Sequence, residues 1–120
     1  MSEFPLTMSF DDVLLVPRRS DITSRREVNL SSSILDRTFT LPVISSPMDT
    51  VTGLDMSISM NNHGGFGIIH RYNSIREQSD IVEMAIKSGA KSIAAAVGVT
   101  ADYESRASAL VAAGAFLLCI

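Results

Sequence analysis

The segment "SIREQSDIVEMAIKSGAKSIAAAV", residues 74–97, combines the signals of a helix with those of a buried strand. It opens with a capping box. The Ser74 hydroxyl accepts a hydrogen bond from a backbone N–H, and the Glu77 carboxylate accepts one from the backbone N–H of Ser74. Apolar residues then recur at three- and four-residue steps and predict one buried stripe on a helix that ends near Gly89: Ile75, Ile81, Val82, Ala85 and Ile86. The continuously apolar run that follows is typical of a parallel strand covered on both faces.

This unit recurs along the chain. Three glycines are each 25 residues apart, and an apolar run follows each of them: Gly64, Gly89 and Gly114. Glycine at the end of a helix suits left-handed backbone angles. The spacing therefore predicts another helix, which starts between Thr100 and Asp102 and ends at Gly114. Its inward-facing residues are expected to be Ala107, Leu110 and Val111.

The segment before the first glycine is less regular. Residues 41–45 are expected to form a strand, while residues 53–62 fit both a strand and a helix. We assign them to a helix, because the strands on either side need a crossover if they are parallel. Residues 1–40 differ from the repeats and predict an N-terminal arm with one or two short strands.

The order of these elements predicts an α/β fold with parallel strands near 41–45, 66–70, 92–97 and 116–120. A (β/α)8 TIM barrel and a doubly wound sheet both have this order. A barrel requires eight units, and the chain stops in an apolar run, so we expect residues 41–120 to be the first half of one. A flavodoxin-like module is a weaker alternative, because no glycine-rich loop opens a helix.

The overall composition excludes several classes of function. A net charge of -3 provides no field that would attract nucleic acid or an anionic membrane. The N-terminus lacks the features of a signal peptide, so we expect a cytoplasmic protein. The lone Cys119 lies in an apolar run and is expected to be structural. His63 and His70 lack a third ligand at metal spacing, which argues against a metal site, and a packed structural role is favoured for His70.

Chemistry is expected just after each strand, because strand C-termini converge on one face of a barrel. After residues 41–45 come Ser46, Pro47, Met48 and Asp49. Ser46 offers a hydroxyl, and Met48 offers a polarizable surface that can lie against a flat ring. These residues could hold a heterocycle, but ordinary turn chemistry explains them equally well.

Several stretches together resemble one family: "LTMSFDDVLLVPRRSDITSRREVNL", "LPVISSPMDTVTGLDMSISM", "HGGFGIIHRYNSI" and "AAVGVTAD". In order and over nearly the whole chain they are similar to the N-terminal part of the IMP dehydrogenase and GMP reductase family. The resemblance implies a (β/α)8 barrel that binds a purine nucleoside monophosphate at the strand C-termini. It also implies a cysteine that attacks C2 of the purine, NAD (NADPH in the reductase) as the cofactor, and a homo-oligomer, commonly a tetramer.

The resemblance assigns roles to three residues of this chain. Ser46 would contact the nucleotide, Met48 would pack near the purine, and Arg71 would lie beside the dinucleotide. No catalytic residue is assigned, because the nucleophilic cysteine is expected beyond residue 120, so Cys119 is not given that role. Any monovalent cation would likewise be bound by residues outside this chain.

Two activities and an inactive state remain open. In many IMP dehydrogenases a pair of CBS modules lies between the second helix and the third strand, and this chain leaves no room for them there. Their absence suits GMP reductase, which converts GMP and NADPH to IMP and ammonia, whereas "SSPMDTVT" and "GGFGIIH" favour the dehydrogenase. A catalytically inactive half-barrel would instead associate through its exposed edge strands.

Overall fold

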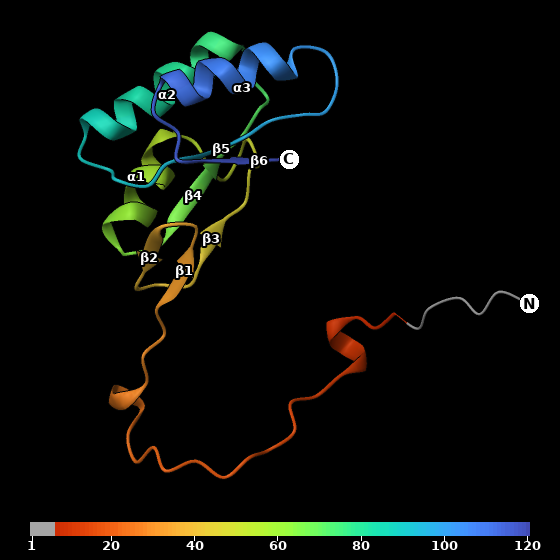
Figure 1. Ribbon diagram of the computed structural model, residues 1–120, viewed down its shortest axis with the longest axis vertical. Coiled ribbons are helices and arrows are strands. Elements are labelled where there is room, and N and C mark those ends of the chain that lie inside the picture. Colours follow the sequence, from red (N-terminus) through yellow and green to blue (C-terminus); the bar gives the residue numbers. More distant parts are fainter. Residues whose placement is uncertain (1–6) are drawn as a thin grey trace, which may run out of the picture.

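The computed structural model describes residues 7–120, which form an extended N-terminal arm, a β-hairpin and an α/β body (Figure 1). The arm contains two single-turn 3-10 helices, Phe10–Asp12 and Arg25–Glu27. The hairpin pairs β1 (Ser32–Ile34) with β2 (Arg37–Phe39). The body consists of β3 (Ile44–Ser45), α1 (Leu54–Asn62), β4 (Phe66–Ile69), α2 (Ile75–Lys87), β5 (Ala94–Ala96), α3 (Tyr103–Ala112) and β6 (Leu117–Cys119).

The body is a four-stranded parallel sheet in the order β3-β4-β5-β6, with one helix in each crossover. Neighbouring strands in the sheet are therefore neighbours in the chain. In a doubly wound sheet the strand order reverses at a switch point. In this sheet each successive strand is added on the same side of the previous one, so the described strands contain no reversal. This order argues against the flavodoxin-like alternative and is compatible with part of a barrel.

The predicted helices begin and end close to the residues that the capping and glycine patterns predicted. The Ser74 hydroxyl accepts from Glu77 N at 3.2 Å, and Glu77 Oε2 accepts from Ser74 N at 2.8 Å, which confirms the capping box of α2. The glycines that follow the three helices have φ values of 85°, 94° and 101°: Gly64, Gly89 and Gly114. Only glycine adopts these angles without strain, so the repeated glycine marks the end of each helix.

The hydrophobic core has two layers, one on each face of the sheet. On the helix face, Ile69 and Ala95 of the strands pack with side chains of α2 and α3, and all of these are fully buried: Val82, Ala85 and Leu110. On the opposite face, the rings of Phe39 and Phe66 lie 4.6 Å apart between centroids. The hairpin therefore covers the amino-terminal end of the sheet face that the helices leave open.

Two apolar residues predicted to lie in buried stripes are exposed instead. Ile86 is 38% exposed and Val111 is 60% exposed. On α2 the fully buried positions are Gln78, Val82 and Ala85, which follow one face at steps of four and three residues. Ile86 lies at the margin of this face, about 40° around the helix from Val82 and about 100° from Ala85. The apolar pattern did not identify Gln78, a polar residue that takes a core position of α2.

The first strand is also less buried than its apolar sequence predicted. Only Ile44–Ser45 of the expected range 41–45 pair as a strand, and the Val43 and Ile44 side chains are 50% and 45% exposed. Pro42 has no N–H to donate to a ladder, and β3 is an edge strand of the described sheet. The other three strands lie inside the ranges 66–70, 92–97 and 116–120.

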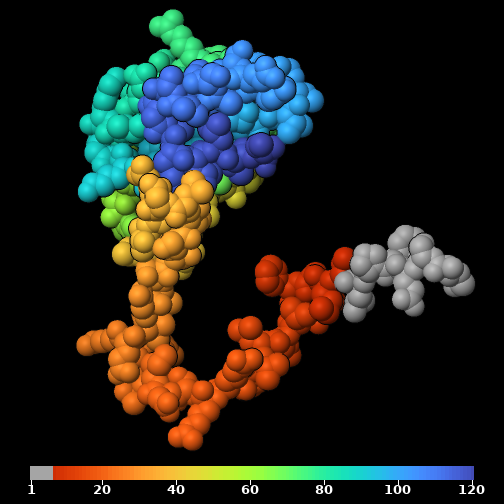
Figure 2. All heavy atoms as spheres, in the orientation of Figure 1, coloured from red at the N-terminus to blue at the C-terminus, as the bar shows by residue number. Residues whose placement is uncertain are grey.

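The arm extends away from the body (Figure 2). Its large apolar side chains are open to solvent, and Phe10, Leu14 and Leu15 are each at least 96% exposed. Among residues 7–120, no helix combines the length and the apolar character needed to cross a membrane.

Candidate functional site

The loop after β3 folds back against the end of β4. Thr52, which is fully buried, anchors it: the Thr52 hydroxyl lies 2.9 Å from Ser45 Oγ and 2.5 Å from the carbonyl oxygen of Ser46. The backbone N–H of His70 donates to the Thr52 carbonyl at 3.3 Å. The loops after β3 and β4 are thus tied together at the carboxyl ends of the two strands.

Ser46 and Met48 lie on the exposed part of this loop. The Met48 carbonyl accepts hydrogen bonds from the N–H groups of Val51 and Thr52 at 3.0 and 2.9 Å, which closes a tight turn. The Met48 side chain is 52% exposed, and Ser46 is exposed as well. The turn therefore places an exposed hydroxyl and an exposed thioether two residues apart in the loop that follows β3.

The tightness of this arrangement depends on Gly67 in β4. A Cβ at this position would lie 2.7 Å from Ser45 Oγ, 2.8 Å from Thr52 Cγ2 and 3.4 Å from the Cα of Ser57. The first two distances are shorter than nonbonded atoms tolerate. The loop can pack this closely on β4 only because residue 67 has no side chain.

Arg71 follows β4 and reaches toward the end of β5. Its Nη1 lies 3.1 Å from the point where a Cβ of Gly98 would be. The guanidinium carbon is 5.9 Å from the centre of the Tyr72 ring, and Arg71 is exposed. Tyr72 N donates to His70 Nδ1 at 3.2 Å, so this nitrogen acts as the acceptor. The predicted cofactor residue therefore presents a positive charge between the ends of two neighbouring strands.

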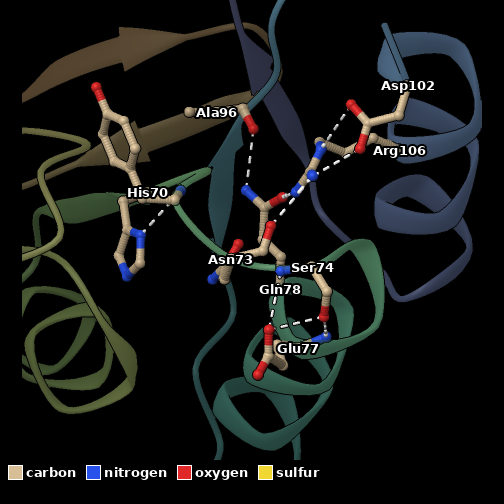
Figure 3. A network of polar contacts seen from close by, with 9 residues as sticks. His70, Asn73, Ser74, Glu77, Gln78, Ala96, Asp102 and Arg106 are labelled. Carbon is tan, nitrogen blue, oxygen red and sulfur yellow. Dashed lines mark hydrogen bonds and ion pairs between the residues drawn. The ribbon is translucent and has the colours of Figure 1, made fainter.

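A polar network with Gln78 and Arg106 at its centre lies at the ends of the same strands (Figure 3). The amide of Gln78 donates to the carbonyl of Ala96 at 2.9 Å and accepts from Arg106 Nη1 at 2.8 Å. Arg106 also donates to the Asn73 carbonyl at 3.1 Å and to Asp102 Oδ2 at 2.7 Å. The network connects the loop after β4 with α2, the end of β5 and the first turn of α3.

The site residues predicted from the sequence did not include Gln78, Asp102 or Arg106. A signal for Gln78 was present: it lies three residues after Ile75 and four before Val82, on the apolar face of a helix. Arg106 gave no comparable signal, because arginine on a helix of this length is normally solvated. In the part of the chain that the structure describes, no group of histidine, cysteine and acidic residues has metal-site geometry.

The network lowers the pKa of Asp102 below its ordinary value of 3.8. The main cause is the hydrogen bond from Arg106, which favours the charged carboxylate. Desolvation is the second-largest effect and opposes this shift, while the positive charges of Arg106 and Arg71 add smaller effects that lower the pKa further. Arg71 is thus close enough to the network to act on it electrostatically.

This pKa shift predicts how acid affects stability. A lowered pKa in the folded state stabilises the protein above the ordinary value of 3.8, and the stabilisation is lost as the pH falls through the folded-state pKa. We expect Asp102→Asn to melt at a lower temperature than the parent near neutral pH, and the gap to narrow below pH 3.8. Thermal unfolding of the full-length protein as a function of pH measures this gap.

The control is Asp80→Asn, which removes an exposed pair with Arg76 at 3.9 Å. An Asp102→Asn gap that does not change with pH would contradict the prediction.

Comparisons with known proteins point to one family. The family model of the IMP dehydrogenase / GMP reductase domain matches residues 7–120. The chain is 42% identical over 101 residues to the inosine-5'-monophosphate dehydrogenase of Nitrosopumilus maritimus. The matched region covers 83% of this chain and 21% of that protein. It is 43% identical over 83 residues to the enzyme of the same name from Staphylococcus aureus strain Mu50, which covers 68% of this chain and 17% of that protein.

The chain therefore spans about a fifth of the length of these relatives. The family match extends from the arm through all six strands. It includes the turn that bears Ser46 and Met48, the loop that bears Arg71, and the polar network. The chain belongs to the IMP dehydrogenase / GMP reductase family.

Proposed function

We propose that this chain supplies the first half of a (β/α)8 barrel in a purine nucleotide oxidoreductase, and that the enzyme is an IMP dehydrogenase. It would convert IMP, NAD and water to XMP and NADH. The observation that carries the proposal is the joining of two loops at the carboxyl ends of adjacent parallel strands, through the bond from His70 N to Thr52 O. Ligands of such sheets bind at that edge. The names of the two relatives support the dehydrogenase.

Three residues of this chain would bind the two nucleotides. The Ser46 hydroxyl can donate a hydrogen bond to the purine nucleotide, and the exposed Met48 thioether can pack against its flat base. The Arg71 guanidinium can pair with a phosphate of the dinucleotide, because its planar fork matches phosphate oxygens. The cysteine that attacks C2 of the purine, and any residues that bind a monovalent cation, would lie outside this chain.

GMP reductase is the second candidate. Residues 88–93 lead directly from α2 to β5, at the place where many IMP dehydrogenases carry CBS modules. This direct connection favours the reductase, whereas the relatives' names favour the dehydrogenase. An inactive fragment that self-associates is a third candidate, because β3 and β6 are the open edges of the described sheet.

The direction of the nicotinamide absorbance change separates these candidates. With the purified full-length protein, IMP and NAD should give an increase in reduced nicotinamide, and omission of IMP should abolish it. GMP and NADPH should give no decrease. A decrease with GMP and NADPH, and no reaction with IMP, would identify the reductase. No change in either assay would contradict both enzyme candidates. We also propose a homo-oligomer, which light scattering on the same sample measures.

Two substitutions test the assigned residues separately. We expect Met48→Ala to raise KM for the purine nucleotide about tenfold, which corresponds to a loss of about 1.4 kcal/mol of binding, and to leave KM for the dinucleotide unchanged. Arg71→Ala should raise KM for the dinucleotide and leave KM for the purine nucleotide unchanged, because it removes a charge that pairs with phosphate. Steady-state kinetics with each substrate varied in turn measures both constants. The control is Met84→Ala, a 44% exposed methionine on α2. Equal effects on both substrates would contradict these roles.

A further inference from the structure

Gln78 lies at the centre of the buried network and bridges two strands. Its side chain is fully buried, and Nε2 lies 3.4 Å from the carbonyl of Ile69 and 2.9 Å from that of Ala96. Its Oε1 accepts from Arg106. The reverse orientation of the amide would place an acceptor against two carbonyls and a donor against a guanidinium, so the partners fix the orientation. Gln78 therefore joins the last residues of β4 and β5.

Arg106 extends this connection to the next loop. Its side chain is 9% exposed, and its donors are divided among three elements. Nη1 bonds to Gln78 on α2, Nη2 to the carbonyl of Asn73, and Nε and Nη2 to Asp102 at the start of α3. A lysine could not make these contacts together, because it lacks the planar fork of donors.

Together the two side chains fix both ends of one short loop. Gln78 contacts the carbonyl of Ile69, immediately before residues 70–73, and Arg106 contacts the carbonyl of Asn73, where the loop ends. The exposed residues between these points are Arg71 and Tyr72. Arg71 is thus held near Gly98 by a backbone that is anchored on either side of it.

We propose that Gln78 and Arg106 are positioning residues that hold the loop 70–73, so that Arg71 is prearranged to receive an anionic group of the dinucleotide. The proposal rests on the function proposed above. A prearranged side chain binds more tightly because less conformational entropy is lost when the ligand arrives. Burying a guanidinium is costly, and replacement of buried ionic groups by apolar ones is often neutral for stability. A role in positioning explains why two polar side chains, Gln78 and Arg106, occupy this buried place. We call this pair the polar clamp.

A double-mutant cycle in the full-length enzyme tests whether Gln78 acts through Arg71. We expect Gln78→Leu to raise KM for NAD about fivefold with little change in kcat, and to have no further effect when Arg71→Ala is already present. The KM for NAD of Arg106→Lys should lie between that of the parent and that of Arg106→Met. The matched control is Arg76→Ala, because Arg76 also pairs with an aspartate four residues away but is 92% exposed. An equal effect of Gln78→Leu in both backgrounds would overturn the proposal.

Hydrogen exchange without substrate, on the parent, Arg76→Ala and one further double variant, tests whether Gln78 and Arg106 hold the loop, independently of Arg71's role. In the double variant Gln78→Leu with Arg106→Met, the amides of residues 72–74 should exchange at least tenfold faster, while those of β4 and β5 exchange as in the parent. Arg76→Ala should leave all of them unchanged. Unchanged exchange at residues 72–74 would overturn the proposal. If exchange rises but Arg71→Ala leaves KM for NAD unaltered, the assigned role of Arg71 fails, and with it the proposed purpose of the polar clamp.

Discussion

Alanine at Gly67 is expected to lower the free energy of unfolding by about 2 to 3 kcal/mol, within the range of overpacked cores, and to raise KM for the purine nucleotide at least tenfold. The added Cβ would lie 2.7 Å from Ser45 Oγ and 2.8 Å from Thr52 Cγ2, so the loop must move off the strand. That movement breaks the contacts of Thr52 with Ser45 and Ser46, which set the position of the turn.

The matched control is Gly53→Ala. Gly53 precedes α1 with a φ of -101°, and a Cβ there would meet nothing within 4 Å. Its expected cost is about 0.5 to 1 kcal/mol, because alanine is a poorer N-cap than glycine. Denaturant unfolding and steady-state kinetics on the full-length protein measure both effects. If Gly67→Ala has the same small effect as the control, the turn is not held by its close contact with β4.

Alanine at Phe39 is expected to cost about 3 to 4 kcal/mol of stability, the range for a large aromatic removed from a core. Phe39 is 6% exposed, and its ring lies 4.6 Å from that of Phe66 and 6.0 Å from that of Phe116. Phe39 is the buried side chain of the hairpin in the core under the sheet, and the partly buried Ile34 packs against this core. Its loss also enlarges an existing cavity of about 70 Å³ that Phe39 and Phe66 help to line.

Phe39→Leu separates the loss of volume from the loss of the ring. Leucine refills much of the space, so we expect a cost of about 1 to 1.5 kcal/mol. Chemical denaturation of the full-length protein gives both values. Arg37 holds the hairpin as well, because its guanidinium bonds to the carbonyl of Lys91 and lies 5.0 Å from the centre of the Phe116 ring. A cost below about 1 kcal/mol for Phe39→Ala would mean that these other contacts are sufficient to hold the hairpin.

Local signals in the sequence were enough to locate the helices. The capping box at Ser74 and the glycine after each helix act within a few residues of where they stand, because they satisfy or release nearby backbone groups. The ambiguous segment 53–62 was settled by the need for a crossover, and α1 is indeed a helix. The apolar stripes were less accurate, since Ile86 and Val111 proved to be exposed.

The candidate site was predicted only in part. Sequence and resemblance pointed to Ser46, Met48 and Arg71, whose roles as nucleotide-binding residues stay predictions. Periodicity could not anticipate the bonds among Gln78, Arg106 and Asp102, because Gln78 and Arg106 lie 28 residues apart on different helices. Whether a buried glutamine is tolerated depends on its partners, and those partners come from elsewhere in the fold.

The order of strands and helices, and the end of each helix at a glycine, follow from short-range backbone preferences and could be predicted from the sequence. The folded structure was needed to show which faces are buried, how the loops after β3 and β4 are joined, and where the charge of Arg71 lies. Those features arise from contacts between distant residues, such as Thr52 with His70 and Arg106 with Asn73, and they form only when the parallel strands are brought into register.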